Sequence, residues 1–204
     1  MARILTLLFL LGSSVLAIAG PATKTVLILG DSLSAGFGIA VEQSWPALLQ
    51  QRLEREKRPY VVANASISGE TTAGGRARLG LALERQKPAL LVLALGANDG
   101  LRGLPVAQMR ANLQAMIQAG KKTGARVLLV GMKLPPNYGP AYTRDYEAAF
   151  ADLAREESVP LVPFLLEPIA TDGKAFLADG LHPTAAAQPR ILGHLWPALA
   201  ASLK

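Results

Sequence analysis

Short runs of apolar residues recur along the chain from residue 25 onward. Four of the five runs consist almost entirely of Val, Ile, Leu or Ala, with little alternation between apolar and polar positions. Strands that are covered on both faces have this pattern, and parallel sheets are covered on both faces. The pattern therefore predicts five strands of a parallel sheet, at residues 25–29, 60–65, 89–95, 126–130 and 159–162.

Apolar residues at helical spacing fill the segments between these runs. They predict helices that begin after Ser44 and after Pro105, and three more over residues 71–86, 142–157 and 185–203. Gly120 is a natural end for the helix that begins after Pro105. Pro189 and Pro197 are expected to bend or interrupt the last helix.

Strands that alternate with helices are typical of a three-layer α/β/α domain with a parallel sheet. Because crossovers between parallel strands are right-handed, we expect a flavodoxin-like five-stranded sheet with strand order 2-1-3-4-5. Residues 23–204 contain no internal repeat, linker or low-complexity tract, so we interpret them as one domain.

Residues 1–22 differ from the rest of the chain. Arg3 is their only charge, the apolar stretch is broken at residues 12–14, and residues 17–19 give a small-x-small pattern. This combination predicts a signal peptide over residues 1–22 and a protein of the periplasm or the medium. A membrane anchor is the alternative, but a span needs roughly 18 to 20 continuous apolar residues. No Cys follows the segment, which excludes a bacterial-type lipid anchor.

The composition narrows the class of protein further. With 50% hydrophobic residues the chain is too apolar for a disordered protein, and without Cys it cannot be a disulfide scaffold or a Cys-ligated metal site. Two His make a multi-His metal centre improbable. A net charge of +6 with 5% aromatic residues does not resemble a nucleic-acid domain with a basic stripe.

Polar residues gather where the expected strands end. Ser32 follows the first strand, Gly69 the second and Asn98 the third, while Asp179 and His182 lie between the fifth strand and the last helix. Open α/β sheets bind ligands outside the carboxyl ends of their strands. We therefore expect these residues to meet at one edge of the sheet.

Their residue types suit nucleophilic catalysis. The Ser32 hydroxyl needs a base, which His182 can supply, and Asp179 can orient the imidazole and stabilise its cation. The backbone N–H groups of Ser32 and Gly69 and the side-chain amide of Asn98 can stabilise an oxyanion.

The same residues resemble the signature of the SGNH, or GDSL-type, hydrolases, which consists of Ser32, Gly69, Asn98 and His182 in this chain. The blocks around them carry the likeness too, reading GDSL, GAND and DGLHP from residues 30, 96 and 179. Several blocks in order are more specific than one four-residue string. The segments GDSLSAGFG, NASISGETTAGG, ANDGLRG and HPTAAAQPRIL are similar to the thioesterase I/lysophospholipase/arylesterase branch. Ala97 departs from the pattern, because a second Gly is common there. We expect Ala97 to be tolerated, with a tilt of the Asn98 loop as the alternative.

Each of these residues also has a simpler interpretation. Ser32 can be a helix N-cap after the first strand, and Asn98 a turn residue that tolerates left-handed geometry. Gly69 can be a turn glycine, and Asp179 with His182 can be an exposed loop pair. The sequence leaves these alternatives open.

Neighbouring residues are interpreted structurally. We expect Asp31 and Asp99 to brace their loops through backbone hydrogen bonds. His194 lies within the last helical pattern, and Trp45 and Trp196 are expected to pack in the core or at its rim.

The segment MKLPPNY, residues 132–138, contains two Pro and is therefore a loop beside the expected site. Its apolar members can line an acyl pocket, although it can also be a simple connection. Arg102 lies near the same rim and can meet an anionic group. The candidates for contacts with a substrate chain are Leu104, Met132, Leu134, Pro135 and Leu181.

The resemblance and the residues together predict a secreted serine esterase that acts on aryl esters, medium- to long-chain acyl esters, lysophospholipids and acyl thioesters. The alternatives are a carbohydrate esterase of the same family and a non-catalytic, flavodoxin-like binding module. We expect a monomer that needs no metal or organic cofactor, binds small-molecule or lipid esters but no nucleic acid, and has no membrane span once the signal is removed.

Overall fold

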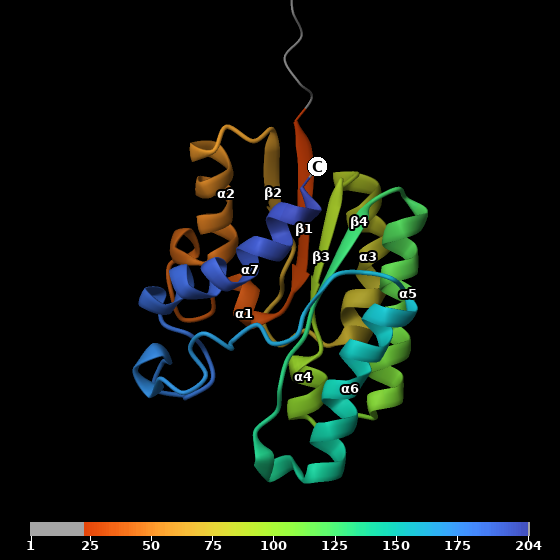
Figure 1. The fold of residues 1–204 in the computed structure, drawn as a ribbon, viewed down its shortest axis with the longest axis vertical. Coiled ribbons are helices and arrows are strands. Elements are labelled where there is room, and N and C mark those ends of the chain that lie inside the picture. Colours follow the sequence, from red (N-terminus) through yellow and green to blue (C-terminus); the bar gives the residue numbers. More distant parts are fainter. Residues whose placement is uncertain (1–22, 204) are drawn as a thin grey trace, which may run out of the picture.

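The central sheet consists of five parallel strands in the computed structural model, which describes residues 23–203 (Figure 1). The order β2-β1-β3-β4-β5 is the one predicted from the connection rules. The strands are β1 (Lys24–Gly30), β2 (Tyr60–Asn64), β3 (Leu90–Ala94), β4 (Arg126–Val130) and β5 (Leu161–Val162).

Helices cover both faces of this sheet (Figure 1). The helices α2 (Trp45–Arg55) and α7 (Gln188–Ser202) pack on one face, where Trp45 and Leu195 are fully buried. The opposite face is covered by α3 (Thr72–Gln86), α5 (Val106–Lys122) and α6 (Pro140–Glu156). All five residues of β3 are buried, as expected for a strand with a helical layer on each side. The three-layer α/β/α architecture is therefore confirmed.

Two very short helices lie at the carboxyl edge of the sheet (Figure 1). They are α1 (Ser32–Ala35), which follows β1, and α4 (Ala97–Leu101), which follows β3. Single 3₁₀ turns lie elsewhere in the connections, at Val41–Gln43, Pro136–Tyr138, Gly173–Ala175 and Ala185–Ala187.

Gly120 does not end α5, so this part of the prediction is wrong. The helix continues to Lys122, and the reversal falls at Gly124, whose φ is +84°. Gly120 is instead packed against the sheet, where a Cβ would lie 2.9 Å from Cδ2 of Leu91 and 3.1 Å from Cγ2 of Val127. The glycine allows close packing and does not act as a stop signal.

The last helix is also more regular than its prolines suggest. Pro189 lies in the first turn of α7, where a missing N–H is tolerated. Pro197 lies inside the helix, yet α7 continues to Ser202 without interruption. The buried side chains of Ile191, Leu195 and Leu199 anchor α7 to the sheet on both sides of Pro197, which offsets the lost hydrogen bond.

The signal peptide predicted for residues 1–22 lies outside the described residues. Within residues 23–203, no helix combines the length and the apolar character needed to cross a membrane.

Candidate active site

Ser32 lies at the first position of α1, directly beyond the end of β1. The helix cap is Asp31 and not Ser32, because Oδ1 of Asp31 accepts the N–H of Leu33 at 3.0 Å. The Ser32 hydroxyl is therefore not needed as a cap. Its Oγ lies 2.9 Å from Nε2 of His182, a residue 150 positions away in the sequence.

His182 is held by a short loop that closes on itself. The N–H of Leu177 donates to the carbonyl of His182 at 2.7 Å, and Phe176 pairs with Pro183 in an antiparallel bridge. The ring of Phe37 contacts the imidazole, with ring centroids 4.3 Å apart. These contacts hold the imidazole next to Ser32.

Asp179 binds the other side of the His182 ring, with Oδ2 2.7 Å from Nδ1. Its Oδ1 accepts the backbone N–H groups of Leu181 at 2.9 Å and His182 at 3.0 Å. The N–H groups of His182 and Leu181, followed by the imidazole, lower the pKa of Asp179 from 3.8 to about 2. The carboxylate is therefore ionised far below neutral pH, which suits the stabilisation of an imidazolium.

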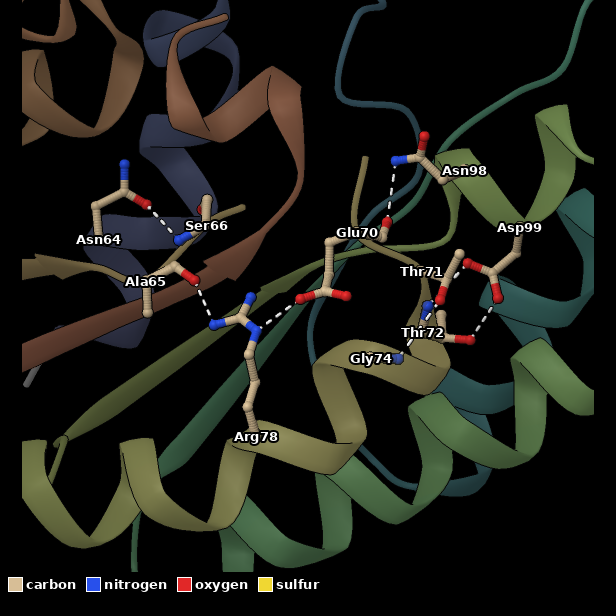
Figure 2. Close-up of polar contacts among 10 residues, drawn as sticks. All are labelled: Asn64, Ala65, Ser66, Glu70, Thr71, Thr72, Gly74, Arg78, Asn98 and Asp99. Atoms are coloured by element: carbon tan, nitrogen blue, oxygen red, sulfur yellow. Dashed lines mark hydrogen bonds and ion pairs between the residues drawn. The ribbon is translucent and has the colours of Figure 1, made fainter. Parts of the chain in front are cut away.

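Asn98 is the second residue of α4, which follows the sharp turn at Gly96, whose φ is +122°. Its Nδ2 donates to the carbonyl of Glu70 at 2.9 Å (Figure 2) and lies 3.4 Å from Oδ2 of Asp31. The side-chain amide therefore lies between the segments that follow β1 and β2. Ala97 is accommodated in the buried layer beneath it.

Gly69 has a φ of +78°, so it occupies a turn that favours glycine. Its carbonyl accepts Nη2 of Arg102 at 2.9 Å. The Arg102 guanidinium thus binds the Gly69 backbone, and Arg102 is absent from the lining of the pocket beside Ser32.

Two aspartates brace the loops, as the sequence predicts. Burial raises the pKa of Asp31 from 3.8 to about 6, and the Leu33 N–H and the His182 charge partly oppose that rise. Asp99 accepts the N–H of Thr72 at 2.8 Å and its hydroxyl at 2.5 Å, which ties α4 to the start of α3 (Figure 2).

A cavity of about 540 Å³ opens beside Ser32 and His182. Of the predicted substrate contacts, Met132, Leu134, Pro135 and Leu181 line it, whereas Leu104 does not. The structure therefore places Leu104 outside this pocket. Its segment packs toward α6, and its carbonyl accepts the hydroxyl of Tyr142 at 2.7 Å.

The sequence analysis missed part of the pocket wall. These residues come from α4 and from the irregular segment after β5, which carries no helix or strand periodicity that would place it. They are Leu101, Phe164, Leu166, Ala170 and Phe176. Together with the predicted residues they make the wall largely apolar.

Metal ligation has no evident place in this part of the chain. Among residues 23–203, no three or more His, Cys, Asp or Glu side chains come close enough to hold a metal ion. The polar side chains at the sheet edge are instead the hydroxyl of Ser32, the imidazole of His182, the carboxylate of Asp179 and the amide of Asn98.

The fold and the site define a three-layer α/β protein with a serine, a histidine and an aspartate in one chain of hydrogen bonds. Proteins that are similar to this chain in sequence include esterases. The chain is 50% identical to esterase TesA of Pseudomonas aeruginosa over 178 residues, which cover 87% of this chain and 89% of that protein. It is 41% identical over 170 residues to thioesterase 1/protease 1/lysophospholipase L1 of Escherichia coli, covering 83% and 80% of the two chains.

A solved structure shows the same relationship. The psychrotrophic esterase EstA of a Pseudoalteromonas species, in a form inhibited by monoethylphosphonate, superposes with a TM-score of 0.84 and 38% identity. The match covers 87% of this chain and 97% of that one.

Residues 28–189 match the GDSL-like lipase/acylhydrolase family. The chain belongs to this family, and it is an enzyme that hydrolyses ester bonds. The resemblance stated from the sequence blocks is thereby confirmed.

Proposed function

We propose that the chain hydrolyses carboxylic esters through an acyl-enzyme formed on Ser32. The observation that carries this proposal is the hydrogen-bonded chain from Asp179 through His182 to Ser32, with separations of 2.7 and 2.9 Å. These distances are within the reach needed for proton transfer between a nucleophile and its base.

In the proposed reaction, Oγ of Ser32 bonds to the ester carbonyl carbon while Nε2 of His182 accepts the hydroxyl proton. The tetrahedral intermediate then collapses, and the leaving alcohol or thiol takes that proton from His182. A water molecule, deprotonated by the same imidazole, attacks the acyl-enzyme and releases the carboxylic acid. Asp179 orients the ring and stabilises its cationic form in both halves of the reaction.

The developing oxyanion needs donors that are already in place. We assign this role to the backbone N–H groups of Ser32 and Gly69 and to the amide of Asn98, which lies at the same edge of the sheet. Loss of one such donor typically lowers kcat by about 10²- to 10³-fold.

The substrate class follows from the pocket. Its volume of about 540 Å³ and its apolar wall of Leu, Met, Phe and Pro side chains suit an acyl chain longer than acetyl. The relatives are named esterase, arylesterase and thioesterase/lysophospholipase, which supports aryl esters, lysophospholipids and acyl thioesters as substrates. The apolar pocket supports medium- to long-chain acyl groups.

We also propose that residues 1–22 direct export and are removed, which leaves residues 23–204 as the catalytic domain in the periplasm or the medium. The single charge and the small-x-small pattern of the segment support this assignment. N-terminal sequencing of the protein recovered outside the cytoplasm is the test, and an intact Met1 on that protein would contradict it.

Labelling with a fluorophosphonate probe, followed by peptide mapping, tests the assignment of the nucleophile. We expect one modified peptide that contains Ser32, and no labelling of the Ser32→Ala variant. That variant should lose p-nitrophenyl ester hydrolysis by at least about 10³-fold while its unfolding transition is retained. Unlabelled wild-type protein would contradict the acyl-enzyme mechanism, and wild-type turnover by Ser32→Ala would exclude Ser32 as the nucleophile.

A series of p-nitrophenyl esters separates the proposed esterase from a carbohydrate deacetylase. Each added methylene that enters the apolar pocket contributes up to about 0.8 kcal/mol of transfer free energy. We therefore expect kcat/KM to rise from acetyl to octanoyl esters. A maximum at acetyl would instead support the deacetylase.

A further inference from the structure

Arg78, in the second turn of α3, reaches back over the loop of residues 65–70 (Figure 2). Its Nε lies 2.7 Å from Oε2 of Glu70, and its Nη1 donates to the carbonyl of Ala65 at 2.5 Å. The side chains of Arg78 and Glu70 are only 25% and 14% exposed. One guanidinium therefore fastens both ends of this loop to α3.

Glu70 connects this ion pair to the amide of Asn98. Its carboxylate binds Arg78, while its own backbone carbonyl accepts Nδ2 of Asn98 at 2.9 Å (Figure 2). Because the two acceptors belong to one residue, the position of the carboxylate constrains the position of the carbonyl.

The orientation of the Asn98 amide depends on this carbonyl. Nδ2 carries two N–H groups, of which one donates to the Glu70 carbonyl at 2.9 Å and the other to Oδ2 of Asp31 at 3.4 Å. The hydrogen bond to Asp31 is long and therefore weak, so an oxyanion can take over this N–H while the shorter bond to Glu70 holds the amide. If the Glu70 carbonyl moved away, the amide could turn toward Asp31 and lose its alignment with an oxyanion, whose donors need to lie about 2.7–3.1 Å from it.

Gly74 provides the space in which the Glu70 carboxylate lies. A methyl group at position 74 would overlap Oε1 of Glu70 and lie 2.9 Å from its Cδ. Gly80, on the same helix, has no atom within 4 Å of its corresponding methyl position. Glycine weakens a helix interior relative to alanine, so the two sites provide a matched pair with opposite expectations.

From these contacts we propose that Arg78 and Glu70, seated over Gly74, are positioning residues that hold the Asn98 amide in the alignment required for oxyanion stabilisation. The proposal rests on the function proposed above, in which Asn98 is an oxyanion donor. Arg78 and Glu70 act through Asn98 and do not touch the substrate.

The test compares Gly74→Ala with Gly80→Ala. For each variant, kcat and KM are measured with one p-nitrophenyl ester, and kcat is divided by the number of Ser32 sites that a fluorophosphonate labels at completion. In Gly74→Ala we expect kcat per labelled site to fall by about tenfold or more, toward the 10²- to 10³-fold loss of a whole donor. KM should stay within about twofold, since ground-state binding is unchanged. Gly80→Ala should retain both constants.

Arg78 variants provide a second measurement that does not alter the backbone of α3. Arg78→Ala should show the same loss of kcat per labelled site, and Arg78→Lys should recover part of it because Lys can still pair with Glu70. The control is Arg85→Ala, an exposed arginine on the same helix, which should behave as the wild type.

The outcomes separate this inference from the proposed function. A purely structural role would lower the midpoint of thermal unfolding and the number of labelled sites, with kcat per labelled site unchanged, and would overturn the inference. A wild-type value of kcat per labelled site in both Gly74→Ala and Arg78→Ala would also overturn the inference. A wild-type enzyme whose Ser32 is not labelled would instead overturn the proposed function itself.

Discussion

Asp31 and Asp179 lie near the same histidine in opposite electrostatic environments. Asp179 accepts two backbone N–H groups and the imidazole, so its pKa falls to about 2. Asp31 is buried, and this burial raises its pKa to about 6. Burial at Asp31 and backbone hydrogen bonds at Asp179 therefore make one carboxylate resist ionisation and the other a stable anion.

The raised pKa of Asp31 makes stability depend on pH. Between about pH 4 and 6 the folded chain retains a proton that the unfolded chain has released, so stability falls as pH rises through this window and stays lower above it. A shift of about 2 units corresponds to roughly 3 kcal/mol. Asp31→Asn keeps an oxygen for the Leu33 N–H and removes the charge.

We therefore expect the free energy of unfolding of Asp31→Asn to rise relative to that of the wild type by up to about 3 kcal/mol from pH 4 to pH 8, which means that the variant becomes relatively more stable. Urea denaturation at both pH values measures it. A difference between variant and wild type that is the same at both pH values would contradict the buried-carboxylate explanation.

Individual site residues were predictable where chemistry and position coincided. Ser32, Asp179 and His182 follow strand ends and carry groups that suit one another, so the sequence was enough to place them together. Glu70 and Arg78 could not be found in this way, because their contacts depend on how the loop after β2 folds over α3. The excluded methyl at Gly74 is a property of that packing and leaves no mark on residue spacing.

At the level of elements, hydrophobic periodicity located every strand of the sheet to within a few residues. The errors of this method fall where tertiary packing, and not the local pattern, decides whether a helix continues. Gly120 resembles a helix stop, yet it lies within α5 because only glycine allows this helix to approach β3 and β4 so closely. Pro197 resembles a helix break, yet α7 continues past it to Ser202 because the helix is packed against the sheet.

Gly120→Ala tests the packing explanation. The new methyl would crowd Leu91 and Val127, and overpacking typically costs about 1–3 kcal/mol. This cost should exceed the gain of about 1 kcal/mol in helix propensity. We expect a net loss of stability in chemical denaturation. Gly193→Ala in α7, where a methyl meets no atom within 4 Å, should instead be neutral or stabilising, and equal behaviour of the two variants would disprove the explanation.

At the level of the whole molecule, the connection rules gave the strand order, and the order brings the ends of β1, β2 and β3 together. What they could not give is the path of the chain after β5, which shapes much of the pocket. That segment is irregular, so its course is set by contacts with the layers on either side and not by a local pattern.

One long-range hydrogen bond joins α2 and α7, the two helices that pack on the same face of the sheet. The buried side chain of Gln188, at the start of α7, accepts the N–H of Trp45, at the start of α2, at 2.9 Å. Gln188→Met keeps the side-chain volume and leaves that N–H unpaired, which typically costs about 1–3 kcal/mol. We expect this loss in the free energy of unfolding. The exposed Gln51→Met should show none, and an equally stable Gln188→Met would contradict the assignment.

The hydrogen bond between residues 32 and 182 also has a consequence for the growing polypeptide. Both histidines of the chain lie beyond residue 181, so a ribosome makes the serine long before any imidazole exists to pair with it. Until residue 182 has been synthesised and its loop has folded beside Phe37, the nascent chain carries an ordinary, unreactive hydroxyl at Ser32. The order of the two residues along the chain thus delays the reactivity of the serine until the histidine has been added.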